Sequence, residues 1–332
     1  MSWLKYIPID KFLLSILTVV ALATLLPAQG EAKEIFKHLT IAAIALLFFM
    51  HGAKLSRKAL LSGLGHWRLH LCVFSSTFLL FPLIGLTLFP LLDLFFDAVM
   101  PGVFTPEIYM GFLFLCALPG TVQAAIAFTS MAGGNVPAAI CSSSASSILG
   151  VFLSPLLVGV LMKTQGEAAG GLDAILAIVL QLMVPFLIGH FLRPWIGVWI
   201  DSHKKLISKV DQTSILLIVY SAFSEAVVEG IWSRVNGWTL TVVFVLSLLL
   251  LILVIVINTF VARRMKFTKA DEITLVFCGS KKSLVNGVPM ANVLFAASTV
   301  GIMILPLMIY HQIQLIACTI LAKHYAKQTK TD

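Results

Sequence analysis

Ten apolar segments follow one another along this chain, and each is long enough to cross a lipid bilayer. Hydrophobic residues make up 59% of the 332 residues and charged residues only 11%, whereas about a quarter of a soluble domain is charged. So few charges cannot cover a surface in water, and lipid must therefore surround much of the chain. The segments lie at 9–27, 38–54, 69–91, 107–131, 136–162, 173–192, 212–230, 238–260, 272–296 and 298–322.

A chain that spans a membrane must satisfy its backbone polar groups internally, so its spans are helices or the strands of a closed barrel. The ten segments lack the alternation of apolar and polar residues that is typical of barrel strands. We therefore predict an all-α polytopic membrane protein with ten transmembrane helices.

Lysine and arginine residues gather on one side of the membrane when the ten segments alternate in direction. Of these 23 residues, 17 lie on the side of the two termini and 4 on the opposite side. The positive-inside rule then places both termini in the cytoplasm. We expect the plasma membrane as the location, which is the inner membrane if the protein is bacterial. Because the net charge of +8 comes from these flanking clusters, we expect lipid and not nucleic acid as a partner.

Two segments are interrupted by residues that disfavour a continuous helix. The segment 107–131 contains Pro119-Gly120, and the segment 272–296 contains Gly279-Ser280 followed by two lysines. Ten spans divide into a first five-helix repeat, 1–162, and a second, 163–332, and repeats with an odd number of spans insert in opposite orientations. Each break then lies in the fourth helix of its repeat. At ~1.5 Å per residue, both breaks are near the middle of the bilayer.

A broken helix frees backbone N–H and C=O groups, which can bind an ion or a polar substrate. A proline kink without a binding role is the alternative for either segment alone. Because the two breaks match in position, we predict a substrate- or ion-binding site where they cross. Its predicted residues are the helix-break positions Pro119, Gly120 and Gly279, and the polar positions Thr121, Gln123, Ser143, Ser147, Ser280, Lys281, Lys282, Ser283 and Asn286.

Lys281 and Lys282 are unusual inside an apolar segment, because one lysine at the centre of a membrane helix costs about 2.5–3.5 kcal/mol. The pair requires a cavity, a counter-charge or the loss of a proton. Alternatively, the segment is misplaced and both lysines reach the cytoplasm. The basic cluster 263–269 already marks the cytoplasmic boundary, which favours the membrane position. Ser143 and Ser147 share one helix face, where close helix packing is the alternative to a binding role.

Four motifs occur in a fixed order: Pro119-Gly120-Thr121, Gly134-Asn135-Val136, Phe152-Leu153-Ser154-Pro155 and Cys278-Gly279-Ser280-Lys281-Lys282-Ser283. In order and depth they resemble the bile acid:sodium symporter family, in its SBF-like branch. The resemblance implies a core domain of segments 3–5 and 8–10 and a panel domain of segments 1, 2, 6 and 7. It also implies alternating-access transport of organic anions, such as bile acids, other sterol conjugates and small carboxylates.

The chain departs from the sodium-dependent members of that family at the positions that the resemblance assigns to sodium. Those members carry a carboxylate before the glycine of the ninth helix and amides after it, where this chain has Phe277, Lys281 and Lys282. Sodium requires oxygen ligands, and two ammonium groups would repel the ion. We therefore expect no cofactor and no metal site, and we doubt coupling to sodium.

The leading functional hypothesis is a secondary transporter of an organic anion or amphipathic solute. One alternative is a membrane-embedded enzyme in which Lys281 activates Ser280. Another is a regulatory membrane protein that keeps the fold without transport. We favour a protein that is not an enzyme. The sequence leaves the oligomeric state open, and one chain suffices for this architecture.

Overall fold

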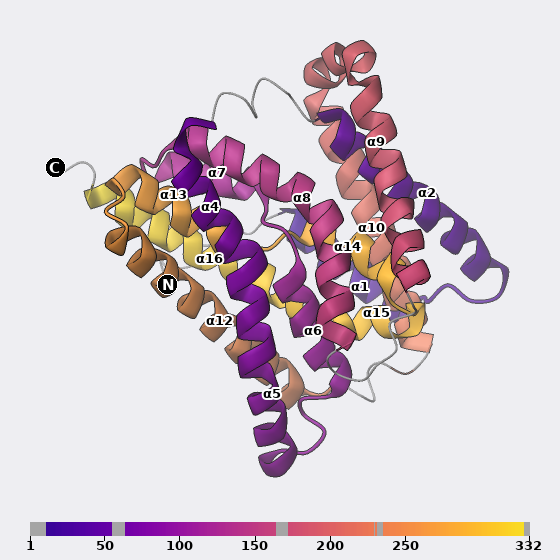
Figure 1. The fold of residues 1–332 in the computed structure, drawn as a ribbon. Coiled ribbons are helices and arrows are strands. Elements are labelled where there is room, and N and C mark those ends of the chain that lie inside the picture. The colour runs from indigo at the N-terminus through magenta and orange to yellow at the C-terminus, as the bar shows by residue number, and fades with distance from the viewer. Residues whose placement is uncertain (1–10, 55–63, 164–171, 229, 231–234, 329–332) are drawn as a thin grey trace, which may run out of the picture. The chain divides into compact units, whose positions relative to one another are not determined.

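The computed structural model describes residues 11–54, 64–163, 172–228, 230 and 235–328. These residues form helices and connecting turns, with no strand among them (Figure 1). The helices are α1 (Lys11–Leu25), α2 (Glu31–Lys54), η2 (Leu64–His66), α4 (Trp67–Ser75), η3 (Ser76–Leu80), α5 (Phe81–Val99), α6 (Pro106–Ala117), α7 (Val122–Met131), α8 (Val136–Lys163), α9 (Leu172–Ser202), α10 (Lys204–Val228), α12 (Gly237–Arg264), α13 (Lys269–Gly279), α14 (Leu284–Leu294), α15 (Ala297–Met303) and α16 (Leu305–Gln328).

Within the described residues, seven helices are long and apolar enough to cross a membrane, or eight if the bent pair α6–α7 is one span. This confirms the predicted class, an all-α polytopic membrane protein. A described helix falls in each of the ten predicted segments, although the start of the first, residue 9, lies outside the described residues. The apolar part of α1, Leu14–Leu25, is shorter than a membrane span. The count of ten spans therefore stays a prediction.

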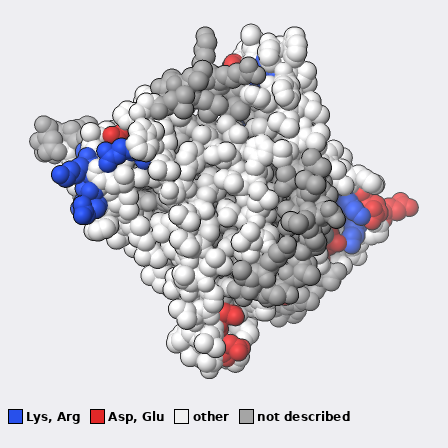
Figure 2. Space-filling model, viewed as in Figure 1, with Lys and Arg blue, Asp and Glu red and all other residues white. Residues whose placement is uncertain are grey.

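Large apolar side chains remain exposed along several helices. On α12, for example, Leu249, Val256 and Phe260 are 55%, 57% and 67% exposed. On the face in Figure 2, the charged atoms form small groups separated by broad areas without charge. Exposed apolar area of this extent is unfavourable in water and is expected of a surface in contact with lipid.

The chain folds into two compact units. The first contains α1, α2, α9, α10, α15 and all of α14 after its first residue. In this unit α2 packs directly on α9, because a Cβ atom added at Gly52 would lie 1.9 Å from the backbone oxygen of Phe186. An added Cβ at Gly189 would lie 2.0 Å from the backbone oxygen of Phe49. The two glycines thus let the helix backbones touch, as small residues commonly do in membrane proteins.

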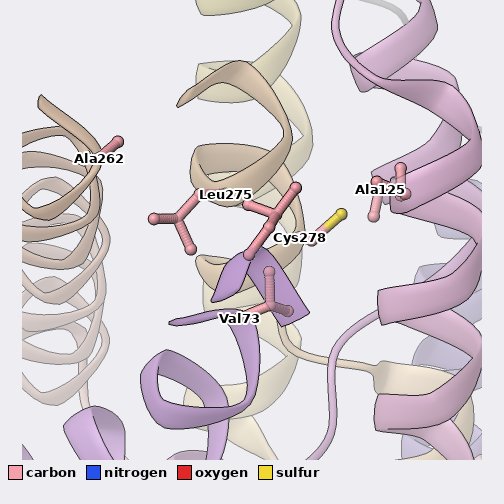
Figure 3. Close-up of a cluster of buried hydrophobic side chains, with 8 residues drawn as sticks. Val73, Ala125, Ala262, Leu275 and Cys278 are labelled. Carbon is pink, nitrogen blue, oxygen red and sulfur yellow. The ribbon is translucent and has the colours of Figure 1, made fainter. Parts of the chain in front are cut away.

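The second unit contains the continuous run α4–η3–α5 together with α6, α7, α8, α12, α13 and α16. Its core surrounds α13. Leu275 and Cys278 of α13 lie between Ala262 of α12 and Ala125 of α7 in Figure 3. The alanines allow the neighbouring helices to approach α13 closely. This packing holds the end of α13, where the second predicted break begins.

Candidate functional site

The first helix break separates α6 from α7, which meet at an angle of 63°. Pro119 cannot donate a backbone hydrogen bond, and its ring keeps the preceding residue out of the helical conformation. Leu118 accordingly has an extended backbone, with φ −75° and ψ 153°. Thr121, the residue immediately before α7, is also extended. The predicted break at Pro119-Gly120 is therefore present.

The second helix break lies between Gly279, the last residue of α13, and Leu284, the first residue of α14. A Cβ atom added at Gly279 would lie 2.9 Å from Asn258 Nδ2 and 3.0 Å from Ser76 Oγ. Glycine thus lets α13 approach both α12 and η3. Ser76 Oγ also donates a hydrogen bond of 2.9 Å to the backbone oxygen of Gly279, so the helix end has a fixed partner.

Each break accepts a hydrogen bond from the other at a backbone carbonyl oxygen. The N–H of Ser283 donates to the carbonyl oxygen of Pro119 at 2.9 Å. In return, Thr121 Oγ1 donates to the carbonyl oxygen of Lys282 at 2.8 Å. A Cβ added at Gly120 would be 3.5 Å from the backbone oxygen of Lys281, which shows how closely the two segments approach. Six of the predicted site residues therefore meet at this crossing.

Lys282 is fully buried, and its ammonium group has a complete set of hydrogen-bond acceptors. Nζ donates to the backbone oxygens of Thr77 at 3.0 Å, Cys116 at 2.9 Å and Leu118 at 2.7 Å. Three acceptors match the three N–H groups of an ammonium ion. The ring of Phe81 also lies under Nζ, 4.0 Å from its centroid, and adds a cation–π contact.

The three acceptors are carbonyl groups that the helices leave without a partner. Cys116 and Leu118 lie at the carboxyl end of α6, where the carbonyls lack intrahelical donors and the helix dipole is negative. Thr77 lies in the π-helical turn η3, where the N–H of Phe81 bonds to the oxygen of Ser76. In an α-helix that N–H would bond to Thr77, so the π turn releases the Thr77 oxygen for Lys282.

Residues of α16 hold the backbone of the second break. Gln314 Oε1 accepts the N–H of Lys282 at 2.9 Å, and Gln314 Nε2 donates to its carbonyl oxygen at 2.9 Å. The hydroxyl of Tyr310 donates to the carbonyl oxygen of Ser280 at 2.7 Å. These three bonds satisfy buried backbone groups that the broken helix leaves free, and they keep the lysine side chain directed at α6.

Lys281 is also fully buried, but its Nζ has no hydrogen-bond partner among the described residues. It lies over two aromatic rings, 4.3 Å from the centroid of Phe128 and 5.6 Å from that of Phe277. Cation–π contacts compensate only part of the cost of removing an ammonium group from water. Adjacent lysines therefore have different environments: Lys282 is fully hydrogen-bonded and Lys281 is not.

The other predicted site residues are placed as follows. Ser143 is buried and donates to Cys278 Sγ at 3.4 Å, whereas Ser147 of the same helix is half-buried. Ser280 is buried, and its hydroxyl donates to the backbone oxygen of Val276 at 2.6 Å. Gln123 is exposed on α7. Asn286 is buried in α14, within the first compact unit.

Sequence reasoning did not identify Thr77, Gln314 or Phe81 as residues of this centre. The run Ser75-Ser76-Thr77 inside an apolar segment was the available signal for a helix irregularity. Gln314 is likewise a polar residue within a predicted span, where such residues are expensive and usually have a role. The carbonyl groups of Cys116 and Leu118 have no sequence signal of their own beyond the neighbouring Pro119.

Multiple apolar helices, two paired helix breaks and two buried lysines define a polytopic membrane protein with a polar centre built from half-helices. A model of the SBF-like CPA transporter family matches residues 10–327, and the chain belongs to this family of membrane transporters. This confirms the resemblance to the SBF-like branch that the motifs predicted.

Three similar proteins align with nearly the whole of this chain. The chain is 59% identical to the "Putative symporter YfeH" of Escherichia coli over 97% of this chain and 94% of that protein. It is 55% identical to an uncharacterized protein of Pseudomonas aeruginosa over 99% of this chain and 96% of the relative. A more distant relative is the sodium/bile acid cotransporter 7-B of Xenopus laevis, at 26% identity over 97% of this chain and 93% of that protein.

Proposed function

We propose that the chain is a secondary active transporter of an organic anion or amphipathic solute, of the bile-acid, sterol-conjugate or small-carboxylate type. Transport proceeds by alternating access at the crossing of the two helix breaks. The names of two relatives, "Putative symporter YfeH" and a sodium/bile acid cotransporter, support a transporter, and the second supports a substrate of the bile-acid type.

One observation carries the proposal: within the part of the chain that the structure describes, the buried Nζ of Lys281 has no hydrogen-bond partner. An ammonium group in a low-dielectric environment is strongly stabilised by a carboxylate, sulfonate or phosphate. Phe128 and Phe277 flank the same nitrogen and present apolar area to the body of an amphipathic anion. We assign to Lys281 the charge that binds the substrate, and to Lys282 a fixed positive charge between the half-helices.

The membrane arrangement belongs to the same proposal. In addition to the spans recognised by length, α1 crosses the membrane once, and α13 and α14 together form one broken span. The chain then has ten spans, in two inverted repeats, 1–162 and 163–332. The third to fifth and eighth to tenth spans form a core domain, and the others form a panel domain. The 17-to-4 distribution of Lys and Arg supports cytoplasmic termini in the plasma membrane.

Sodium coupling is disfavoured by the same centre. The three carbonyl oxygens that could bind a cation already accept hydrogen bonds from Lys282. Phe277, in the position of the family's carboxylate, offers no oxygen ligand. We propose that Lys282 supplies permanently the positive charge that a coupling ion supplies in sodium-dependent relatives.

The geometry gives less support to a serine–lysine enzyme. Such a pair requires a hydrogen bond between the hydroxyl and the amine. Ser280 Oγ donates instead to Val276 of its own helix, and Lys281 Nζ lies over two phenylalanine rings.

The proposal is tested by uptake into proteoliposomes that contain the purified full-length chain. Radiolabelled taurocholate and a panel of small carboxylates are offered to the unmodified protein, to Lys281→Gln and to Lys209→Gln, a control at an exposed position of α10. We expect saturable uptake of at least one anion, lost in Lys281→Gln and retained in the control. Equal uptake by Lys281→Gln would contradict the role of this lysine. Uptake of none of these anions by the unmodified protein would favour the regulatory alternative.

A further inference from the structure

The first compact unit contains a cavity of about 400 Å³ between α2, α10 and α14. Cavities of this size are large enough for a small organic ligand. One part of its lining is apolar and includes Phe36, Ile41 and Ile44 of α2. The remainder is polar or charged, so the cavity combines the two kinds of surface that a ligand site needs.

A buried hydroxyl in this lining lacks a partner. Ser224 of α10 is 2% exposed, and its Oγ has no hydrogen-bond partner among the described residues. The neighbouring hydroxyls of Thr40 and Ser221 bond to each other at 2.8 Å. A buried hydroxyl that is left unpaired costs free energy, and a ligand with an oxygen or nitrogen acceptor removes that cost. Ser224 thus indicates a polar ligand in the cavity.

The charged residues of the lining are balanced in sign. Lys33 of α2 pairs with Glu225 of α10 at 3.0 Å. Glu34 and Lys37 of α2 form a looser pair at 3.9 Å, and both of these side chains are more than 60% exposed. An exposed pair at this distance contributes little, so a ligand can replace it at small cost. Two positive and two negative groups favour a ligand that carries both charges over one that carries either charge alone.

We propose that this cavity binds an amphipathic zwitterion. The ligand's anionic group contacts Lys37, its cationic group contacts Glu34 and Glu225, and its apolar part lies against Ile41 and Ile44. Ser224 donates a hydrogen bond to the ligand. The cavity lining shares no residue with the helix breaks, so either assignment can fail without the other. A soluble zwitterion and the head group of a zwitterionic lipid share this chemistry.

The assignment is tested by binding of three probes with one apolar frame to the detergent-purified full chain, measured by equilibrium dialysis. Phenylalanine is a zwitterion, 3-phenylpropanoate lacks the ammonium group, and phenylalaninamide lacks the carboxylate. We expect phenylalanine to bind about fivefold more tightly than either analogue, because each analogue leaves one sign of charge unmatched. Equal or tighter binding of 3-phenylpropanoate, or no binding of any probe at millimolar concentrations, overturns the proposal.

Two variants connect the binding to the cavity. Ser224→Ala removes the unpaired hydroxyl, and phenylalanine should bind about fivefold more weakly. Glu225→Gln removes one of the two carboxylates proposed to contact the ligand's cationic group, and the preference should shift from phenylalanine to 3-phenylpropanoate. Ser214→Ala, at a buried serine of α10 outside the cavity lining, should bind as the unmodified chain does. Unchanged binding in Ser224→Ala and an unchanged preference in Glu225→Gln would place the probes elsewhere and overturn the proposal.

The two sources of the ligand are separated in lipid nanodiscs. If phosphatidylethanolamine in the nanodisc abolishes phenylalanine binding, the cavity takes the lipid head group. If phenylalanine still binds, the ligand is a soluble zwitterion, and both results keep the assignment. Competition by the anionic phosphatidylglycerol, with none by phosphatidylethanolamine, overturns it.

Discussion

The side-chain nitrogen of Lys282 lies 2.7 Å from the backbone oxygen of Leu118, so one helix break places a positive charge at the end of the other. The carboxyl end of α6 is a site of negative partial charge that, in lipid, has no water to stabilise it. Lys282 stabilises that end from within the chain. The buried lysine and the broken helix therefore compensate each other, although each alone would be costly in a membrane.

Replacing Lys282 should destabilise the fold. Lys282→Met keeps most of the side-chain volume but leaves the oxygens of Thr77, Cys116 and Leu118 without their donor. Each buried unsatisfied carbonyl costs about 1–3 kcal/mol, so the total loss should be at least about 3 kcal/mol. The midpoint of thermal unfolding in detergent measures it, with Lys209→Met as the exposed control. An unchanged midpoint would show that these hydrogen bonds contribute no net stability.

The same position allows a chemical rescue. Lys282→Ala leaves an empty volume beside the three carbonyl oxygens, which an ammonium or methylammonium ion can fill. Either salt should raise the unfolding midpoint of Lys282→Ala but not that of the unmodified protein. Equal responses in both proteins would argue against a specific cation position at the end of α6.

Lys281→Met should have the opposite effect on stability. No described residue forms a hydrogen bond with the ammonium group of Lys281, so an apolar side chain of similar length removes an uncompensated buried charge. Losing the contacts with the two phenylalanine rings offsets part of this gain. We expect a net rise in the free energy of unfolding on the order of 1 kcal/mol. A lower midpoint in Lys281→Met than in the unmodified protein would indicate that Lys281 supports the fold.

The sequence indicates features that a residue causes at its own position, but not contacts between distant parts of the chain. Proline and glycine restrict or release the backbone at their own positions, and both breaks could therefore be predicted from Pro119-Gly120 and Gly279. The acceptors of Lys282 could not, because Thr77 lies 205 residues away along the chain. Its carbonyl is available only because a single turn, η3, has π geometry.

The different environments of Lys281 and Lys282 could not be predicted from the sequence either. The prediction treated the two lysines as one polar feature, a pair that stands where the sodium-dependent members have amides. Adjacent residues in a non-helical segment point in different directions, and their surroundings come from separate helices. The structure gives the three carbonyl acceptors to Lys282 and the aromatic surroundings to Lys281.

A methyl group added at Gly150 should disturb the first helix break. A Cβ atom at Gly150 of α8 would lie 2.4 Å from Pro119 Cβ, and the proline ring cannot rotate away. Gly150→Ala should therefore lower stability by about 1–3 kcal/mol and reduce uptake. Gly237→Ala, at the start of α12 where an added Cβ has no neighbour within 4 Å, is the matched control. Equal midpoints for the two variants would show that α6 and α8 can separate without cost.

Orientation can be measured with reporter fusions. The charge distribution predicts that Thr105, at the start of α6, faces outside, and that Ser202, Thr268 and the C-terminus face the cytoplasm. Ala169 is also expected outside, but it lies outside the described residues. A cytoplasmic signal from a fusion at Thr105 would contradict the ten-span arrangement.

Uptake should not depend on sodium. The carbonyl oxygens at the end of α6 already accept hydrogen bonds from Lys282, and Lys281, the preceding residue, carries a second buried ammonium group. Two unit charges 4 Å apart repel by about 4 kcal/mol at an effective dielectric constant near 20, which opposes a further cation. Uptake into proteoliposomes should therefore be the same when choline replaces sodium, and radioactive sodium should not bind to the purified chain. A steep dependence of uptake on sodium concentration would instead mean that oxygens near Thr121 and Ser143 hold the ion beside both lysines.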